Sequence, residues 1–300
     1  MGQGATVQKM GHKFSLIGDD ACSARAWVRG TRSGARAAFV LALLCLLPGC
    51  QTVQTTQAGQ VGVTRNQWMG VSAEQVNTAS ARSYRKLLQD AETKKQLNRD
   101  PMAVARVQGI AKRLIPQTAN FRNDAPGWAW ETNLFQQDEV NAFCMAGGKI
   151  GVYSGLIDRL HPTDDELAAV MGHEIAHALR EHVREQVSAQ QAAKLPGLVL
   201  AVVTGNQALV DLGDMVTNVT LTLPKSREAE READEIGVEL AARAGYDPRA
   251  AVSLWQKMNR LGGSRPPELL STHPAPESRV QDLEQMSQVV LPLFEKSRKR

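Results

Sequence analysis

The sequence has no apolar run as long as the ~20 residues that a membrane-spanning helix needs. Its two longest apolar runs, Ala37 to Leu47 and Leu195 to Gly205, extend over only about eleven residues each. We interpret the second run as a buried helix, with a flap facing membrane or substrate as the alternative. The chain is therefore not expected to cross a membrane several times.

A basic surplus is also missing outside the first 49 residues. The formal net charge is +4, but the basic excess lies in this leader, and basic and acidic residues balance in the rest of the chain. Composition therefore gives no support for nucleic-acid binding. The hydrophobic content of 43% is that of an ordinary globular protein.

The leader has the order of features found in an export signal. Arginines ending at Arg36 precede the apolar run, which closes with Leu-Pro-Gly and Cys50. This ending resembles the bacterial lipobox, whose cysteine is acylated and begins the mature protein. We predict a lipoprotein signal peptide over residues 1–49 and lipidation of Cys50; a buried cysteine or an uncleaved helix anchor is the alternative. Gln51, by resemblance to Gram-negative lipoproteins, suggests the periplasmic side of the outer membrane.

Cysteine is scarce, with four residues in the chain. Cys22 and Cys45 lie in the leader and Cys50 is expected to carry lipid, so Cys144 alone remains. A single cysteine excludes an intramolecular disulfide. We interpret Cys144 as a small buried hydrophobic residue.

The mature chain divides into a short polar segment and one domain. Residues 50–72 are rich in Gln, Thr, Gly and Val without periodicity, which is typical of a flexible tether. Residues 73–115 favour helices with a break at Pro101, and short apolar stretches between Trp128 and Tyr153 favour strands. We expect an α+β, mainly helical domain over residues 73–300 with a small antiparallel sheet.

One helix of this domain is predicted to carry metal ligands. Met171 to His177 contains the pattern His-Glu-x-x-His, and on a helix His173 and His177 lie close enough around the axis to bind one ion. Thr163 and Glu166 fit a capping box at the start of this helix. Apolar residues recur every four positions on the opposite face, so the histidines are expected to face a cleft.

A third ligand is needed, because two histidines make a poor zinc site. The acidic run from Ser226 to Asp234 offers Glu230 and Asp234 on one helix face. We predict His173, His177 and Glu230 as ligands of one zinc ion, with Asp234 orienting a ligand imidazole. Small residues beside these groups on both helices favour close packing. The alternative is a solvated charged helix.

Glu174 is the predicted catalytic residue. It follows His173 and lies ~100° further around the helix, where its carboxylate reaches a water beside the metal without being a ligand. We predict that Glu174 takes a proton from this water as general base and returns it to the leaving amine.

These segments resemble the gluzincin metallopeptidases of the HtpX and CAAX prenyl protease type, which include periplasmic BepA- and LoiP-like lipoprotein proteases. The family's Ser-Arg-x-x-Glu-x-x-Ala-Asp signature is matched from Ser226 to Asp234. Asn141 to Ile150 resembles the family's Asn-Ala-Phe segment and following strand, with Ala146 where proline is commoner. Thr272 to Arg279 is similar to a segment of BepA-like members. The resemblance extends over about residues 75 to 285.

The resemblance implies a zincin-like fold and zinc-dependent hydrolysis of peptide bonds in unfolded or misassembled envelope proteins. A lipoprotein chaperone that uses this fold to bind its clients is the alternative function. The resemblance also implies that one strand pairs with an extended peptide substrate. The residues of this strand are Gly148, Lys149, Ile150, Gly151, Val152 and Tyr153.

Three further histidines lie outside the His-Glu-x-x-His pattern in the mature chain. His273 is interpreted as a transition-state donor, as a fourth zinc ligand that displaces the water, or as a loop histidine with local contacts only. His161 and His182 are expected to have no role. His182 is expected to lie on the same helix as His173 but roughly opposite to it, and therefore away from the metal.

Overall fold

The computed structural model describes residues 51–204, 212–261, 267–274 and 278–299. The predicted signal peptide and the lipidated Cys50 lie outside these residues. Among the helices that are described, none has the length and apolar character required to cross a membrane. The mainly helical fold with a small sheet agrees with the prediction.

Helices precede the sheet, as the sequence predicts. Helix α2 (Ala73–Thr93) begins with a capping box from Ser72 and Gln75. Helix α3 (Pro101–Leu114) has Asp100 as its N-cap and proline in its first turn, where the missing N–H of proline costs nothing. The 3-10 segments η1 (Ile115–Asn120) and η2 (Ala125–Gly127) lead to the first strand of the sheet.

The main sheet has three strands in the order β3-β5-β4. Strands β4 (Ala142–Met145) and β5 (Lys149–Tyr153) form an antiparallel hairpin, whose turn places Gly147 and Gly148 at positive φ. Strand β3 (Glu131–Phe135) pairs with β5 in parallel. The sheet is thus mixed, and the expectation of a wholly antiparallel sheet is wrong, because β4 lies on the far side of β5 rather than between β3 and β5.

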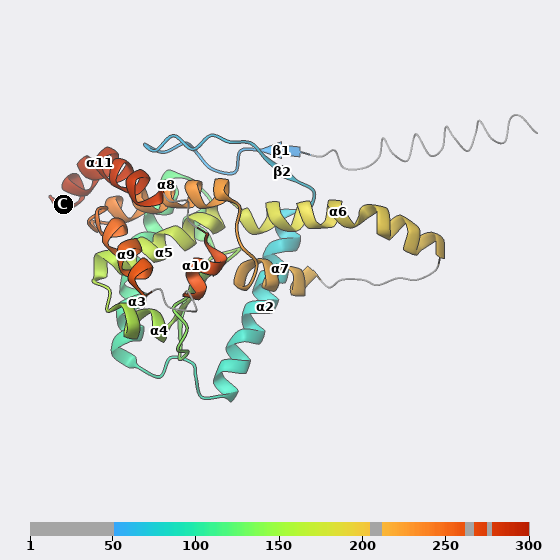
Figure 1. Cartoon of the computed structure of the whole chain (residues 1–300), viewed down its shortest axis with the longest axis horizontal. Helices are drawn as coiled ribbons and strands as arrows, with labels where there is room; N and C mark the ends of the chain where they lie inside the picture. The colour runs from blue at the N-terminus through green and yellow to red at the C-terminus, as the bar shows by residue number, and fades with distance from the viewer. Residues whose placement is uncertain (1–50, 205–211, 262–266, 275–277, 300) are drawn as a thin grey trace, which may run out of the picture. The chain divides into compact units, whose positions relative to one another are not determined.

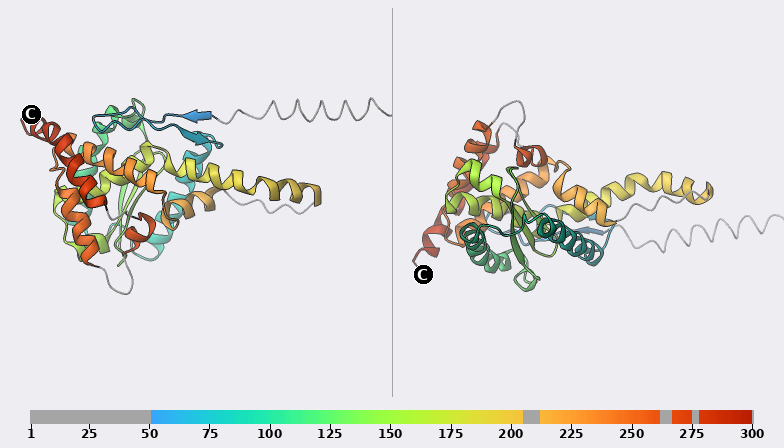
Figure 2. Two further views of the ribbon diagram at one scale, coloured as in Figure 1. Left: turned by 45° about the horizontal axis from the view of Figure 1, so that its top comes forward. Right: turned by 90° about the horizontal axis from the view of Figure 1, so that it is seen from below.

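The remaining helices surround the sheet and one another. Helix α4 (Ser154–Leu160) follows the sheet directly. Helices α5 (Asp164–Leu179) and α8 (Arg227–Arg243) then lie side by side in the centre of the domain (Figure 1). Helix α9 (Ala250–Arg260) packs against α5, and α11 (Arg279–Ser297) packs against α8 and α9. The short helix α10 (Glu268–Thr272) lies between α5 and α7 in Figure 1. Helix α6 (His182–Thr204) extends beyond the other helices (Figure 2). Helix α7 (Leu212–Leu221) packs against α6 and α2. The apolar run from Leu195 is helical as far as Thr204.

The segment expected to be a flexible tether is folded onto the domain. Its strands β1 (Gln51–Val53) and β2 (Gln67–Met69) pair antiparallel. The side chains of Val63, Gln67 and Met69 are buried, and the Gln67 amide donates to the carbonyl of Arg180 at 2.8 Å. The structure thus differs from the expectation, because scattered apolar and polar residues without periodicity still find buried partners in the domain.

Candidate active site

Helix α5 places three of the predicted site residues. Its N-terminus has the predicted capping box, in which Thr163 accepts from the Glu166 amide and Glu166 accepts from the Thr163 amide. The apolar side chains that recur every four positions are fully buried: Leu167, Met171, Ile175 and Leu179. Because the apolar face packs into the core, it sets the rotation of α5. The side chains of His173, Glu174 and His177 therefore point toward α8 and the loop after α10, where all three are buried.

Helix α8 approaches α5 closely because glycine occupies both contact positions. A Cβ added to Gly172 would lie 2.8 Å from the carbonyl oxygen of Gly237, and one added to Gly237 would lie 2.7 Å from the amide nitrogen of His173. The close packing predicted from the small residues is therefore confirmed. It brings Glu230 and Asp234 of α8 to the histidines of α5.

We predict that Gly237→Ala lowers the free energy of unfolding by about 1–3 kcal/mol, because the new methyl group overpacks the α5–α8 contact. The same change should weaken metal binding, since it displaces His173 relative to Glu230. Gly109→Ala is the matched control: Gly109 lies on α3 with nothing within 4 Å of its added Cβ, and should stabilise the protein by about 0.5–1 kcal/mol. Urea unfolding of both variants tests this, and equal stability of Gly237→Ala and wild type contradicts it.

Four side chains converge on one point in the structure. One ligand atom from each of His173, His177, Glu230 and His273 lies within 4.8 Å of the others, and all four residues are buried. The Nε2 atoms of His173 and His177 are 3.1 Å apart. The Glu230 carboxylate lies 3.3 Å from His177 Nε2 and 2.9 Å from His273 Nδ1. The structure therefore brings together the three predicted ligands and adds His273, which comes from the loop after α10.

This donor set fits a divalent metal such as zinc, for which imidazole nitrogen and carboxylate oxygen are common ligands. Burial raises the pKa of Glu230, but His273, His173 and His177 outweigh it and hold this pKa well below its usual range. Burial also lowers the pKa of His177. The carboxylate is therefore ionised and His177 is neutral, which are the forms that bind a metal.

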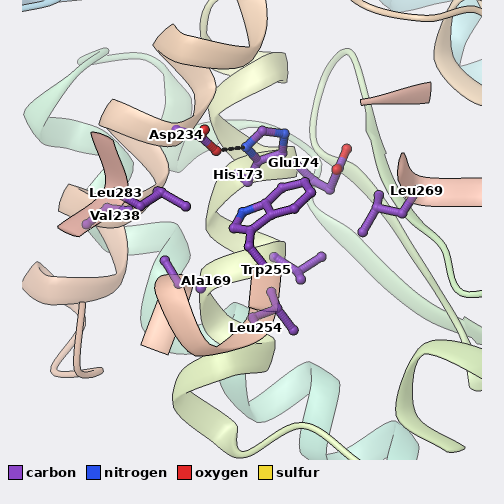
Figure 3. A pocket seen from close by; sticks show the side chains of 11 residues that line it. Ala169, His173, Glu174, Asp234, Val238, Leu254, Trp255, Leu269 and Leu283 are labelled. Atoms are coloured by element: carbon purple, nitrogen blue, oxygen red, sulfur yellow. Dashed lines mark hydrogen bonds and ion pairs between the residues drawn. The ribbon is translucent and has the colours of Figure 1, made fainter. Parts of the chain in front are cut away.

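His173 is the protonated member of the cluster. Burial lowers its pKa, but hydrogen bonds to Asp234 and Glu230 outweigh this effect and raise the pKa to about 9. The Asp234 carboxylate lies 2.9 Å from His173 Nδ1 (Figure 3), in the place predicted for it. Asp234 holds one proton on Nδ1, so a metal at this site would displace only the proton of Nε2, which faces the cluster.

Arg279 is a site residue for which the sequence predicted no role. Its guanidinium donates to Asp234 at 2.6 Å and to Glu230 at 3.1 Å, and it stacks on the Trp255 ring at 3.4 Å. The cation thus compensates two buried carboxylates at once. The only signal for it was its place at the end of the segment that resembles BepA-like members.

Glu174 lies beside the cluster without joining it. It is buried, and in the described part of the chain its Oε1 accepts no hydrogen bond. This oxygen lies 3.5 Å from His273 Nε2. A small apolar pocket borders Glu174 and His173 (Figure 3); it is lined by Ala169, Leu254, Trp255, Leu269 and others. A buried carboxylate oxygen without a protein partner is suited to hold a reacting water.

The interpretation of His182 is wrong. Helix α5 ends at Leu179, and Glu181 has a φ of 54°, so His182 begins the separate helix α6. This break turns the His182 ring toward His177, with 2.7 Å between the two Nδ1 atoms. The residue therefore touches a predicted metal ligand, and the error came from extending α5 through a left-handed residue.

The prediction for the substrate strand also needs correction. Strand β5, which carries Lys149 to Tyr153, is the central strand and has neighbours on both sides, so it has no free edge for a peptide. Strand β4 packs against α5, and no other described strand pairs with its outer side. Because Tyr153 donates to the Asn141 carbonyl, alternate residues of β4 face β5, and the backbone groups of Ala142 and Cys144 face outward.

Comparisons with known proteins agree with this geometry. The model for Peptidase family M48 matches residues 101–287. Mitochondrial metalloendopeptidase OMA1 of Arabidopsis thaliana is 40% identical over 159 residues, which are 53% of this chain and 32% of that protein. Its namesake in Saccharomyces cerevisiae is 28% identical over 270 residues, with 85% of this chain and 76% of that protein covered.

A bacterial relative matches as well. The beta-barrel assembly-enhancing protease of Escherichia coli K12 is 28% identical over 208 residues, which are 66% of this chain and 42% of that protein. This chain thus spans less than half of the Arabidopsis and E. coli relatives. The family model covers the sheet, α5 and α8, including His173, Glu174, His177 and Glu230. The chain therefore belongs to Peptidase family M48, whose members are zinc-dependent metallopeptidases.

Proposed function

We propose that this chain is a zinc-dependent endopeptidase of the bacterial cell envelope that hydrolyses misfolded or misassembled envelope proteins. The observation that carries the proteolytic part is the buried cluster of His173, His177 and Glu230 with Glu174 beside it. These four residues are the ones that the sequence predicts as zinc ligands and general base. The cellular part rests on the leader and on the E. coli relative.

His173, His177 and Glu230 hold the zinc ion in this proposal. Bound zinc acidifies a water and stabilises negative charge on the peptide carbonyl oxygen. Glu174 takes the proton from the attacking water and passes it to the amine of the leaving peptide. Glu230 stays ionised beside Arg279, and Asp234 keeps the His173 ring in its orientation.

The position of His273 favours a direct role at the metal. Its Nδ1 lies among the possible ligand atoms, and its Nε2 points toward Glu174. A fourth protein ligand closes a tetrahedral zinc site to water. As a ligand His273 would exclude the water, and as a free imidazole beside Glu174 it would donate to the transition state.

The substrate is an extended peptide segment that pairs with the outer edge of β4. Ala142 and Cys144 present outward backbone groups there, and the amide of Ala142 donates to the Asn141 side chain at 2.9 Å. Ala146, which follows β4, and His177 line one small cavity, so the edge runs toward the metal ligands. Because strand addition needs a segment free of other structure, unfolded proteins are the expected substrates.

Two features support the envelope location and a lipid anchor on the membrane. The leader ends in the lipobox-like segment before Cys50, and the E. coli relative has an assembly-enhancing role in its printed name. That name also favours a second candidate function, a chaperone for outer-membrane proteins that uses the same fold to bind its clients. A chaperone has no need for Glu174, so the peptidase is our first choice.

The test uses the full-length lipidated protein with one outer-membrane β-barrel protein, offered unfolded in urea-diluted form and folded in detergent. We expect cleavage of the unfolded form only, because the folded barrel has no free strand to pair with β4. Cleavage should stop with a zinc chelator and return with added zinc. Mass spectrometry of the mature N-terminus should show acylated Cys50.

Each result has a distinct consequence. Protection of the unfolded protein from aggregation without any cleavage would favour the chaperone. Cleavage that persists in the chelator would remove the metallopeptidase mechanism. An N-terminus that keeps the leader would remove the lipid anchor but not the enzyme.

A further inference from the structure

A chain of buried polar contacts leads away from the predicted ligand His177 on the side opposite the metal cluster. His177 Nε2 faces Glu230 at 3.3 Å, whereas its Nδ1 lies 2.7 Å from Nδ1 of His182. His182 Nε2 in turn lies 3.0 Å from a carboxylate oxygen of Glu232. All three side chains are buried.

The proton positions follow from this geometry. When Nε2 of His177 binds a metal, its one proton is on Nδ1, which donates to Nδ1 of His182. A neutral His182 then carries its proton on Nε2, which donates to Glu232. Each ring nitrogen of His177 and His182 then has one donor or acceptor role, so none of these four nitrogens is left without a partner.

Glu232 is fixed by two arginines from different parts of the chain. Arg180, which follows the end of α5, donates from Nε at 2.9 Å. Arg65, from the segment before α2, donates from Nε at 2.7 Å and also binds Glu185 at 2.6 Å. Because Glu232 is completely buried, its charge depends on these two cations.

We propose that His182 and Glu232 are positioning residues for the metal ligand His177, and that Arg65 makes the segment of residues 51–71 part of the metal site. This inference deepens the proposed function, since it rests on His177 as a ligand. The contacts fix both the tautomer and the ring orientation of His177. The segment next to the predicted lipid anchor thereby acts on the affinity for zinc.

Isosteric variants of His182 separate the two contacts. Asparagine places its amide oxygen near the position of Nδ1 and keeps an acceptor for His177, whereas glutamine places its amide near Nε2 and keeps only the contact with Glu232. We expect the dissociation constant for zinc to rise about 10- to 100-fold in His182→Gln and His182→Ala. A smaller rise is expected in His182→Asn.

Arg65→Ala tests the contribution of the N-terminal segment. We expect its dissociation constant for zinc to rise about tenfold, in the range known for groups that support a ligand. Arg231→Ala is the matched control, because Arg231 lies on α8, is half exposed and, among the described residues, pairs with Glu228 and Glu235. Its affinity for zinc should equal that of wild type.

The measurement is zinc competition against a chromogenic chelator on the full chain, with thermal unfolding of the metal-free proteins as the folding control. A purely structural role for His182 would lower stability in the asparagine and glutamine variants alike and leave both affinities unchanged, which would overturn the proposal. Equal affinities in Arg65→Ala and wild type would remove the N-terminal segment from it. If wild type itself bound no zinc, the proposed function would fail instead.

Discussion

Glu174→Gln is expected to lower kcat for hydrolysis of an unfolded protein by about 10³- to 10⁴-fold, the upper range for loss of a general base. Glutamine has nearly the same shape as glutamate, but its amide cannot take a proton from water. Glu174 lies outside the cluster of possible ligand atoms, so zinc content should equal that of wild type. KM should change little, because the carboxylate acts on the water rather than on the β4 edge.

The measurement combines steady-state kinetics with metal analysis of the same preparations. Glu139→Gln is a suitable control, because Glu139 is an exposed carboxylate in the loop before β4. Wild-type rates in Glu174→Gln would show that another group activates the water. Loss of both zinc and activity would mean that Glu174 holds the metal, contrary to the geometry.

The sequence was sufficient for the parts of the site that depend on local helical geometry. The spacing of His173 and His177 requires only that α5 be a helix, and its capping box and apolar repeat make it one. Glu230 and Asp234 are related in the same way on α8. Glycine at the contact between the helices then brings these two local patterns together.

The features that the sequence did not predict depend on contacts between distant segments. The strand order β3-β5-β4 depends on which side of β5 strand β4 occupies. The alternation of side chains along β4 is the same on either side, so it does not predict the order. Arg279 lies 45 positions from Asp234 in the chain, and no local period relates them. The path of residues 51–71 likewise follows from partners such as Glu232 and Arg180, which lie far along the sequence.

His182 shows how one backbone angle decides the role of a side chain. An uninterrupted α5 would carry His182 five positions beyond His177, on a different face of the helix. The left-handed conformation of Glu181 instead begins a new helix. Glutamate rarely adopts positive φ, so the local sequence did not predict that the helix is interrupted between Leu179 and His182.

Glu230→Gln is expected to weaken zinc binding by more than the roughly 100-fold that the loss of an outer group costs, because an anionic ligand becomes a neutral amide. The imidazoles of His173, His177 and His273 and the guanidinium of Arg279 surround Glu230. Among the four possible ligands, the Glu230 carboxylate is the one that offers the zinc ion a negative charge. Glutamine keeps an oxygen that accepts from Arg279, so the fold should be preserved. Hydrolysis should fall with zinc content and recover only in part at high zinc.

Glu228→Gln is the matched control on the same helix, because Glu228 is half exposed and pairs with Arg231 at 2.7 Å. Its zinc affinity and activity should equal those of wild type. Zinc competition and hydrolysis of an unfolded substrate give the two readouts. If Glu230→Gln binds zinc as tightly as wild type, then His273 supplies the third ligand in its place, because it is the remaining donor of the cluster. The double variant Glu230→Gln with His273→Ala distinguishes that arrangement, since it should then lose the metal although each single variant retains it.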